Sequence, residues 1–210
     1  MKRVFAMVMA VVMAAVMFAG CSAGGNNNAS NNSGDGDTIK VGLLGPHSGG
    51  YAVYGLGVRN GAELYFKKVN EAGGINGTKI EFNFQDDEHD PEKSVNAYNK
   101  LMDEGMQVLM GTVTSAPCVA VAAVALEDNM FLLTPSGSAV ECVANPNAFR
   151  ICFSDPNQGV GSADYIAEHK LASKVAVFYN VSDVYSNGIY EKFAAEAAAK
   201  GIEVVTAQAF

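Results

Sequence analysis

Short apolar segments alternate with amphipathic segments from Thr38 to Phe210, and this alternation restricts the fold more than any other feature of the chain. Residues 39–44 form a short apolar run that ends at Gly45-Pro46, as expected of a buried strand. Further strands are predicted at residues 79–86, 108–110, 130–134, 148–153, 174–179 and 202–207. Helices are predicted around residues 58–69, 91–104, 119–129, 158–169 and 186–200. Strands separated by single helices indicate an α/β fold with a parallel sheet covered on both faces.

Two of the helix starts carry capping signals. Asp90 precedes Pro91, so its carboxylate can cap the helix while the proline occupies the first turn, where a missing N–H costs nothing. Ser186 is predicted to cap the last helix.

Ligands of open parallel sheets bind beyond the carboxyl ends of the strands, where the direction of the connections reverses. The loops that follow predicted strands are therefore the candidate binding loops. They are residues 45–57, 87–90, 111–117, 135–147 and 180–186.

Two segments of these loops, residues 111–117 and 135–138, are uncharged and rich in hydroxyl groups. Residues 111–117 offer three hydroxyls beside a predicted helix N-terminus, and residues 135–138 offer two more together with a glycine. Free backbone N–H groups and the helix dipole favour an anion at such a place. Neutral donors suit a carboxylate better than a phosphate, which usually recruits Lys or Arg. The alternative interpretation is that these side chains simply cap helices.

Charge and motif content exclude several classes of function. The chain has 14 basic and 22 acidic residues and a net charge of -8, so no nucleic-acid partner is expected. It has no Gly-x-Ser-x-Gly elbow and no Walker lysine, and its glycines miss the dinucleotide fingerprint by one residue. We therefore expect no enzyme and no cofactor. The remaining enzymatic alternative is an exported hydrolase that uses Ser115 as its nucleophile.

The N-terminus reads as an export signal. Lys2 and Arg3 precede an apolar run, residues 4–19, which is shorter than the roughly 20 residues of a membrane-spanning helix. Residues 18–21, Phe-Ala-Gly-Cys, resemble a bacterial lipobox, which predicts that Cys21 receives a lipid after residues 1–20 are removed. Residues 22–37 contain no side chain that can pack, and residues 21–37 are predicted to be a flexible tether.

Three cysteines remain in the globular part, and one disulfide plus one free thiol is the expected pattern in an exported chain. Cys118 and Cys142 follow neighbouring strands and are the favoured pair, whereas Cys152 suits a buried strand position. No Cys-x-x-Cys pair is present, so no structural zinc is expected. The acidic residues 86–90 are interpreted as a strand end followed by a helix cap, and no metal site is expected there.

Several segments after Thr38 carry a recognisable pattern when taken in order. They are residues 39–49, 59–64, 70–77, 86–91, 134–136, 149–150 and 158–159. Together they closely resemble the leucine/isoleucine/valine-binding proteins, the extracytoplasmic solute receptors of branched-chain amino acid ABC transporters. The resemblance implies a type I periplasmic-binding-protein-like fold of two α/β lobes that close on the ligand. The first lobe would be residues 38–154 and a partial second lobe residues 155–210, so a truncated product is expected.

The resemblance also implies site residues. The ligand carboxylate would bind Ser115 and Ser138, with the backbone of Ser136, and Ala116 belongs to the same predicted set. Tyr54 and Tyr185 match aromatic residues that cover the ligand from either lobe. The acidic partner of the ligand ammonium would lie beyond Phe210. Some relatives carry a disulfide at the positions that correspond to His89 and Thr114, and this pair cannot form one.

The implied function is that of a lipid-anchored extracytoplasmic receptor, which captures a branched-chain or related amino acid and delivers it to a membrane permease. The alternative is a sensory receptor of the same fold for an amide or another small acid.

Overall fold

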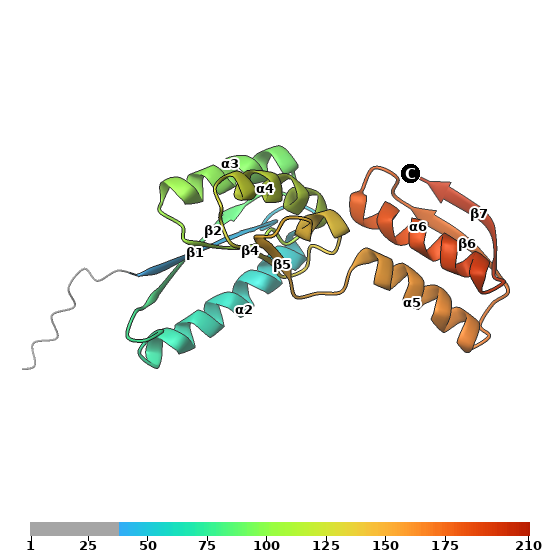
Figure 1. Cartoon of the computed structure of the whole chain (residues 1–210), viewed down its shortest axis with the longest axis horizontal. Coiled ribbons are helices and arrows are strands. Elements are labelled where there is room, and N and C mark those ends of the chain that lie inside the picture. Colours follow the sequence, from blue (N-terminus) through green and yellow to red (C-terminus); the bar gives the residue numbers. More distant parts are fainter. Residues whose placement is uncertain (1–37) are drawn as a thin grey trace, which may run out of the picture. The chain divides into compact units, whose positions relative to one another are not determined.

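The computed structural model describes residues 38–210, in which strands and helices alternate (Figure 1). The predicted α/β class is confirmed. The strands are β1 Ile39–Gly45, β2 Ile80–Asp86, β3 Val108–Met110, β4 Leu132–Thr134, β5 Ala148–Arg150, β6 Lys174–Tyr179 and β7 Glu203–Ala209. The helices are α2 Ala52–Glu71, α3 Pro91–Asp103, α4 Ser115–Glu127, the 3-10 helix η1 Val140–Val143, α5 Asp155–Glu168 and α6 Val184–Ala199.

The predicted signal peptide, the lipidation of Cys21 and the tether lie outside the described residues. Within residues 38–210, no helix is both long enough and apolar enough to cross a bilayer.

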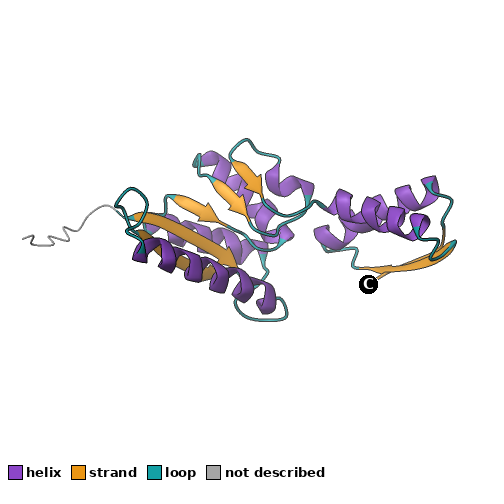
Figure 2. Ribbon diagram, turned by 90° about the horizontal axis from the view of Figure 1, so that it is seen from below, coloured by secondary structure: helices purple, strands orange, loops and turns teal. Residues whose placement is uncertain are grey.

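The larger sheet is parallel and has the strand order β2-β1-β3-β4-β5. Figure 1 shows α3 and α4 on one side of these strands and α2 on the other, and Figure 2 shows the strands lying between helices. In this strand order the direction of the connections reverses between β1 and β3, which is where such sheets bind ligands. The second sheet contains β6 and β7, also parallel, and α5 packs against α6 beside it.

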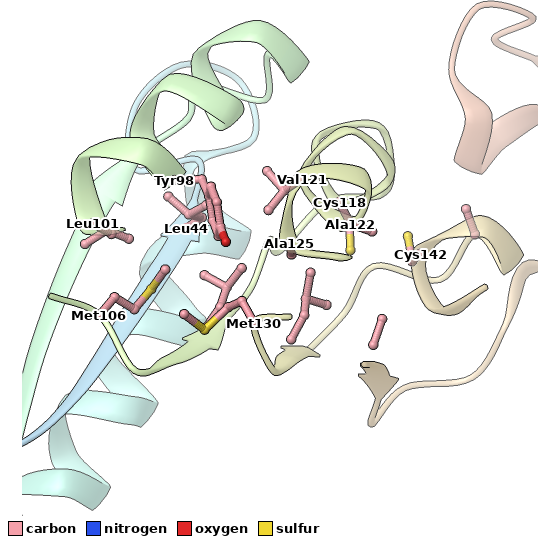
Figure 3. Packing of buried hydrophobic residues seen from close by; sticks show 14 residues of the cluster. Leu44, Tyr98, Leu101, Met106, Cys118, Val121, Ala122, Ala125, Met130 and Cys142 are labelled. Carbon is pink, nitrogen blue, oxygen red and sulfur yellow. The ribbon is translucent and has the colours of Figure 1, made fainter. Parts of the chain in front are cut away.

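The core of the larger sheet lies between its strands and the two helices α3 and α4 (Figure 3). Leu44, Leu109 and Leu132 project from three neighbouring strands and meet Tyr98 and Val121 from the helices, all of them fully or almost fully buried. Burial of one such side chain contributes roughly 1.5–3 kcal/mol. This packing holds in place the loops that follow β3 and β4.

The predicted bounds of β3 and β6 agree with the structure, and so does the start of α3. The Asp90 carboxylate accepts a hydrogen bond from the backbone N–H of Lys93 at 2.8 Å, and Pro91 is the first helical residue. The side-chain cap was therefore predicted correctly.

Helices α2 and α6 begin at Ala52 and Val184 instead of around residues 58 and 186, so Tyr54 lies in α2 and not in the predicted loop.

Helices α4 and α5 also begin earlier than predicted, and each has a proline in its first turn. Helix α4 begins at Ser115 instead of residue 119, and α5 begins at Asp155 instead of residue 158. Pro117 and Pro156 lie in the first turns of these helices, where proline is tolerated because no intrahelical N–H bond is lost.

The predicted cap of the last helix was wrong. Helix α6 begins at Val184, and the Asp183 carboxylate accepts hydrogen bonds from the backbone N–H groups of Tyr185 and Ser186 at 3.3 and 3.4 Å. The hydroxyl of Ser186 instead accepts a bond from the Asn180 N–H at 3.0 Å. Three strands also differ from their predicted bounds. Strands β4 and β5 are shorter than predicted, and β7 extends two residues further at its C-terminal end.

The predicted disulfide between Cys118 and Cys142 is not formed, because both residues are free thiols. They are fully buried, and their sulfur atoms point toward each other from α4 and η1 (Figure 3). The Cys142 thiol donates a hydrogen bond to the Ser115 carbonyl at 3.7 Å, and the neighbouring Cys118 thiol together with burial raises the pKa of Cys142. Cys152 follows β5 and is only partly buried, so its expected strand position was also wrong.

Candidate functional site

A cavity of about 290 Å³ lies where the loops after the strands converge. Its volume is at the small end of the roughly 300–1,000 Å³ typical of ligand pockets, which suits a small ligand. Every strand from β1 to β6 contributes a residue from the segment that follows it. These residues are Tyr51 after β1, His89 after β2, Ser115 after β3, Ser138 after β4, Phe153 after β5 and Asp183 after β6.

The structure brings five of the six predicted ligand residues to this one cavity. They are Tyr54, Ser115, Ser136, Ser138 and Tyr185. Ala116 lies in the first turn of α4 and does not line the cavity. The ligand contacts of all six residues stay predictions.

Ser115 connects two of the hydroxyl-rich loops. It is the first residue of α4 and is 4% exposed. Its hydroxyl oxygen accepts hydrogen bonds from the backbone N–H groups of Ser138 and Ala139, both at 3.2 Å. The loop after β4 is thereby held against the N-terminus of α4.

The N-terminus of α4 offers backbone donors to the cavity region. The N–H groups of a helix's first turn have no intrahelical partner, and the helix dipole places partial positive charge there. Thr114 makes no side-chain cap bond, and Pro117 has no N–H, so Ser115 and Ala116 carry the free donors. Such neutral donors can hold a carboxylate without a cationic side chain.

The loop after β4 is fixed by side-chain hydrogen bonds. The Ser136 hydroxyl donates to the carbonyl of Val113, and the buried Thr134 hydroxyl donates to the carbonyl of Thr112 at 2.7 Å. Thr134 also accepts a bond from the Gly137 N–H at 2.8 Å. The two hydroxyl-rich loops therefore form one rigid wall.

The carbonyl of Ser138 links this wall to α5. It accepts hydrogen bonds from the Asp155 N–H at 3.0 Å and from the Arg150 guanidinium at 2.8 Å. Asp155 is 2% exposed, and burial raises the pKa of its carboxyl, whereas the Ser138 hydroxyl and the Arg150 charge oppose that shift.

The two predicted aromatic residues come from different helices. Tyr54 in α2 is 61% exposed, and Tyr185 in α6 is 39% exposed, so both retain surface that a ligand could cover. The Gln158 amide donates a hydrogen bond to the Tyr185 hydroxyl at 3.4 Å.

His89 was not predicted as a ligand residue, although its loop was a candidate. Its Nδ1 atom lies 2.9 Å from the Thr114 hydroxyl oxygen, and its ring stacks on Tyr51 with centroids 3.8 Å apart. His89 and Thr114 are the two positions at which the sequence resemblance implies a disulfide in some relatives. Burial lowers the pKa of His89, while the carboxylates of Asp183 and Asp90 act in the opposite direction.

Six further cavity residues were missed as site residues, namely Tyr51, Val113, Thr114, Cys152, Phe153 and Asp183. Four of them lie in loops that follow predicted strands, which is the only signal that could have indicated them. Cys152 and Phe153 had no such signal, because they were assigned to the predicted strand 148–153.

The hydroxyl of Ser115 could act as a nucleophile only if a neighbouring base activated it. In the part of the chain that the structure describes, no His, Cys, Asp and Glu side chains form a group that could hold a metal ion. The bonds to the Ser115 hydroxyl within residues 38–210 come from backbone N–H groups, and no imidazole or carboxylate activates it. The hydrolase alternative therefore has no support from this geometry.

Comparisons with known proteins agree with this fold. Residues 38–210 match the family model described as "Periplasmic binding protein". The chain is 32% identical to "Leu/Ile/Val-binding protein homolog 3" of Brucella melitensis over 80% of this chain and 46% of that protein. The chain thus spans about half the length of this relative.

Solved structures give the same result. The branched-chain amino acid transporter substrate binding protein LivJ of Streptococcus pneumoniae, in complex with isoleucine, superposes with a TM-score of 0.77 at 27% identity. The match covers 83% of this chain and 50% of that one. An ABC-transporter solute binding protein of R. palustris, in complex with benzoate, gives a TM-score of 0.73 at 30% identity, with 83% and 48% covered.

Proposed function

The chain belongs to the periplasmic binding protein family, and from that premise we propose that it captures a small amino acid outside the cytoplasm for uptake by an ABC transporter. Its proposed partners are the amino acid and the permease that receives it. The relative from Brucella melitensis and the Streptococcus pneumoniae structure support a branched-chain amino acid as the ligand.

One observation carries the proposal, namely the joining of Ser115 and Ser138 in the wall of the cavity. The Ser115 hydroxyl and the free N–H groups at the start of α4 are neutral donors beside a helix dipole. A carboxylate in a partly dry cavity gains charge-assisted hydrogen bonds from such donors. Isoleucine and benzoate, the ligands named for the two solved structures, both carry a carboxylate.

The remaining predicted contacts follow from this placement. We assign Tyr54 and Tyr185 to the cover of the ligand side chain, and Ser136 and Ala116 to the surroundings of the carboxylate. Residues 38–154 and 155–210 would then belong to two lobes that approach each other around the ligand. Closure of such lobes gives binding proteins much of their affinity.

We also propose that the protein is held at the membrane surface through Cys21. The basic start, the apolar run and the Phe-Ala-Gly-Cys segment support export and lipidation. Two acyl chains give stable anchoring where one would be marginal. Mass spectrometry of the membrane fraction should find the diacylglyceryl group on Cys21. Recovery of an unmodified chain that begins at Met1 would contradict this assignment.

Calorimetric titration of the full chain tests the binding function. Isoleucine, leucine and valine should release or absorb heat with a saturable isotherm, whereas leucinamide, which lacks the carboxylate, should not bind. Ser115→Ala should weaken binding of all three amino acids at least tenfold. Ser162→Ala is the matched control, because that hydroxyl donates only to the carbonyl of Gln158 on α5. Absence of binding with every amino acid would reject the proposal.

A second candidate ligand is a small aromatic acid. Tyr51, Tyr54, Phe153 and Tyr185 give the cavity aromatic walls, and the R. palustris relative holds benzoate. Such a ligand would also suit a sensory receptor of the same fold. Titration with benzoate in the same experiment decides between the two ligand classes.

A further inference from the structure

One imidazole joins three of the loops that form the cavity. His89, after β2, has its Nδ1 atom 2.9 Å from the Thr114 hydroxyl after β3. Its ring face stacks on Tyr51, after β1, at 3.8 Å and an interplanar angle of 26°. All three residues line the cavity, and they do so on the side of the sheet formed by β1, β2 and β3.

This arrangement leaves one nitrogen for a ligand. Tyr51 covers one face of the imidazole, and the Thr114 hydroxyl is hydrogen-bonded to Nδ1. The second nitrogen, Nε2, lies at the ring edge and has no hydrogen-bond partner within residues 38–210. His89 is held rigidly, since its backbone N–H also donates to the Asp87 carboxylate at 2.9 Å. The backbone φ of His89 is 63°, in the left-handed region, which further restricts the position of the ring.

The Nε2 atom can act as donor or acceptor. The Thr114 hydroxyl can donate to Nδ1, which leaves Nε2 protonated, or accept from it, which leaves Nε2 as an acceptor. Burial lowers the pKa of His89, so the neutral imidazole prevails near pH 7 although Asp183 and Asp90 favour its charged form. A neutral ligand group that both donates and accepts fits either tautomer.

We propose that His89 is a specificity-determining residue, and that among branched-chain amino acids and related amino acids of similar size it favours those whose side chain carries a hydroxyl or a carboxamide. This inference rests on the proposed function, because it concerns the side chain of the same ligand. An aliphatic side chain would cover Nε2 without giving it a hydrogen bond, and the lost solvation would weaken binding. A hydroxyl or amide of similar size would restore that bond.

Isosteric pairs of amino acids test the inference on the full chain. Calorimetry should give a Kd for threonine about fivefold lower than for valine, and for asparagine about fivefold lower than for leucine. His89→Phe keeps an aromatic ring against Tyr51 but removes both nitrogens, so the two ratios should fall to about one. Tyr51→Phe tests whether the polar contact belongs to the neighbouring hydroxyl instead. Tyr165→Phe, whose ring contacts His169 away from the cavity, is the control and should leave both ratios unchanged.

The ratio of two Kd values remains informative if a variant is partly unfolded, because both ligands meet the same fraction of competent protein. His89→Asn is a second test, because asparagine readily adopts the left-handed backbone conformation found at this position. This variant should also reduce the two ratios of Kd values.

The failures are distinguishable. Binding of valine and leucine at least as tight as that of threonine and asparagine would overturn the role of His89 and leave the proposed function intact. If His89→Phe weakens the binding of all four amino acids by the same factor, the residue is purely structural, and this result also overturns the inference. Loss of discrimination in Tyr51→Phe would assign the polar contact to Tyr51. If no amino acid binds the unmodified chain, the proposed function itself fails.

Discussion

The hydroxyl oxygen of Ser115 accepts hydrogen bonds from the backbone of Ser138 at 3.2 Å and from that of its neighbour Ala139. One side chain at the start of α4 therefore fixes the loop after β4. The same residue supplies a free backbone N–H at the cavity, so its structural role and its proposed binding role share one position.

Ser115→Ala should destabilise the protein as well as weaken binding. Two buried N–H groups lose their acceptor, and such a loss costs about 1–3 kcal/mol. Urea unfolding of both proteins measures this difference in the free energy of unfolding. Ser162→Ala should change it by less than about 0.5 kcal/mol. Equal stability of Ser115→Ala and the unmodified chain would show that the two N–H groups find other acceptors.

Two glycines of α2 should respond in opposite ways to alanine. A Cβ atom on Gly55 would lie 1.9 Å from the carbonyl oxygen of Pro46, whereas one on Gly57 would meet nothing within 4 Å. Gly55→Ala should therefore lower stability and displace the loop that carries Tyr51. Gly57→Ala should raise stability by up to about 1 kcal/mol, the gain in helix propensity. Thermal unfolding of both variants checks the sign, and a stabilising Gly55→Ala would contradict the close packing.

Asp87 should make stability depend on pH in the mildly acidic range. The side chain is fully buried, and burial raises the pKa of its carboxyl to about 6 from 3.8. Because the folded pKa lies above the unfolded one, this contribution to stability is fully present below pH 3.8 and is lost as the pH rises through 6. The full loss is up to about 3 kcal/mol.

Asp87→Asn isolates that contribution. The amide can still accept from the His89 N–H and can donate to the Ser94 hydroxyl, whose present bond to the carboxylate is 3.2 Å. Relative to the unmodified chain, the variant should gain stability between about pH 4 and 6.5 and hold that gain above it. Urea unfolding across this range measures the difference. A stability difference that does not change with pH would refute the raised pKa.

The three described cysteines should react in a fixed order. Cys152 lines the cavity and is partly buried, so iodoacetamide should modify it first in the folded protein. Cys118 and Cys142 should react only after unfolding, since both are fully buried. Mass spectrometry of peptides identifies each site, and a saturating ligand should slow the modification of Cys152. If Cys118 and Cys142 stay unmodified in denaturant until a reductant is added, they form the disulfide that the structure lacks.

The sequence alone determined the features that depend on neighbouring residues. The alternation of short apolar segments with amphipathic segments predicted the α/β class. Asp90 and Pro91 predicted the start of α3, because a helix cap acts within one helical turn. The same local signals misplaced the starts of α4 and α5, since proline breaks a helix interior but is accepted in the first turn.

Only the tertiary structure decided which distant residues meet. Ser115 and Ser138 are 23 residues apart, and His89 and Thr114 are 25 residues apart. Ser115 and Ser138 follow the neighbouring strands β3 and β4, whereas His89 and Thr114 follow β2 and β3, which lie on either side of β1. Both pairs meet because the carboxyl ends of parallel strands share one edge of the sheet. No periodicity within either loop carries that information. Only the resemblance to relatives with a disulfide at positions 89 and 114 indicated that these two loops lie close together, and the hydrogen bond between His89 and Thr114 came from the structure.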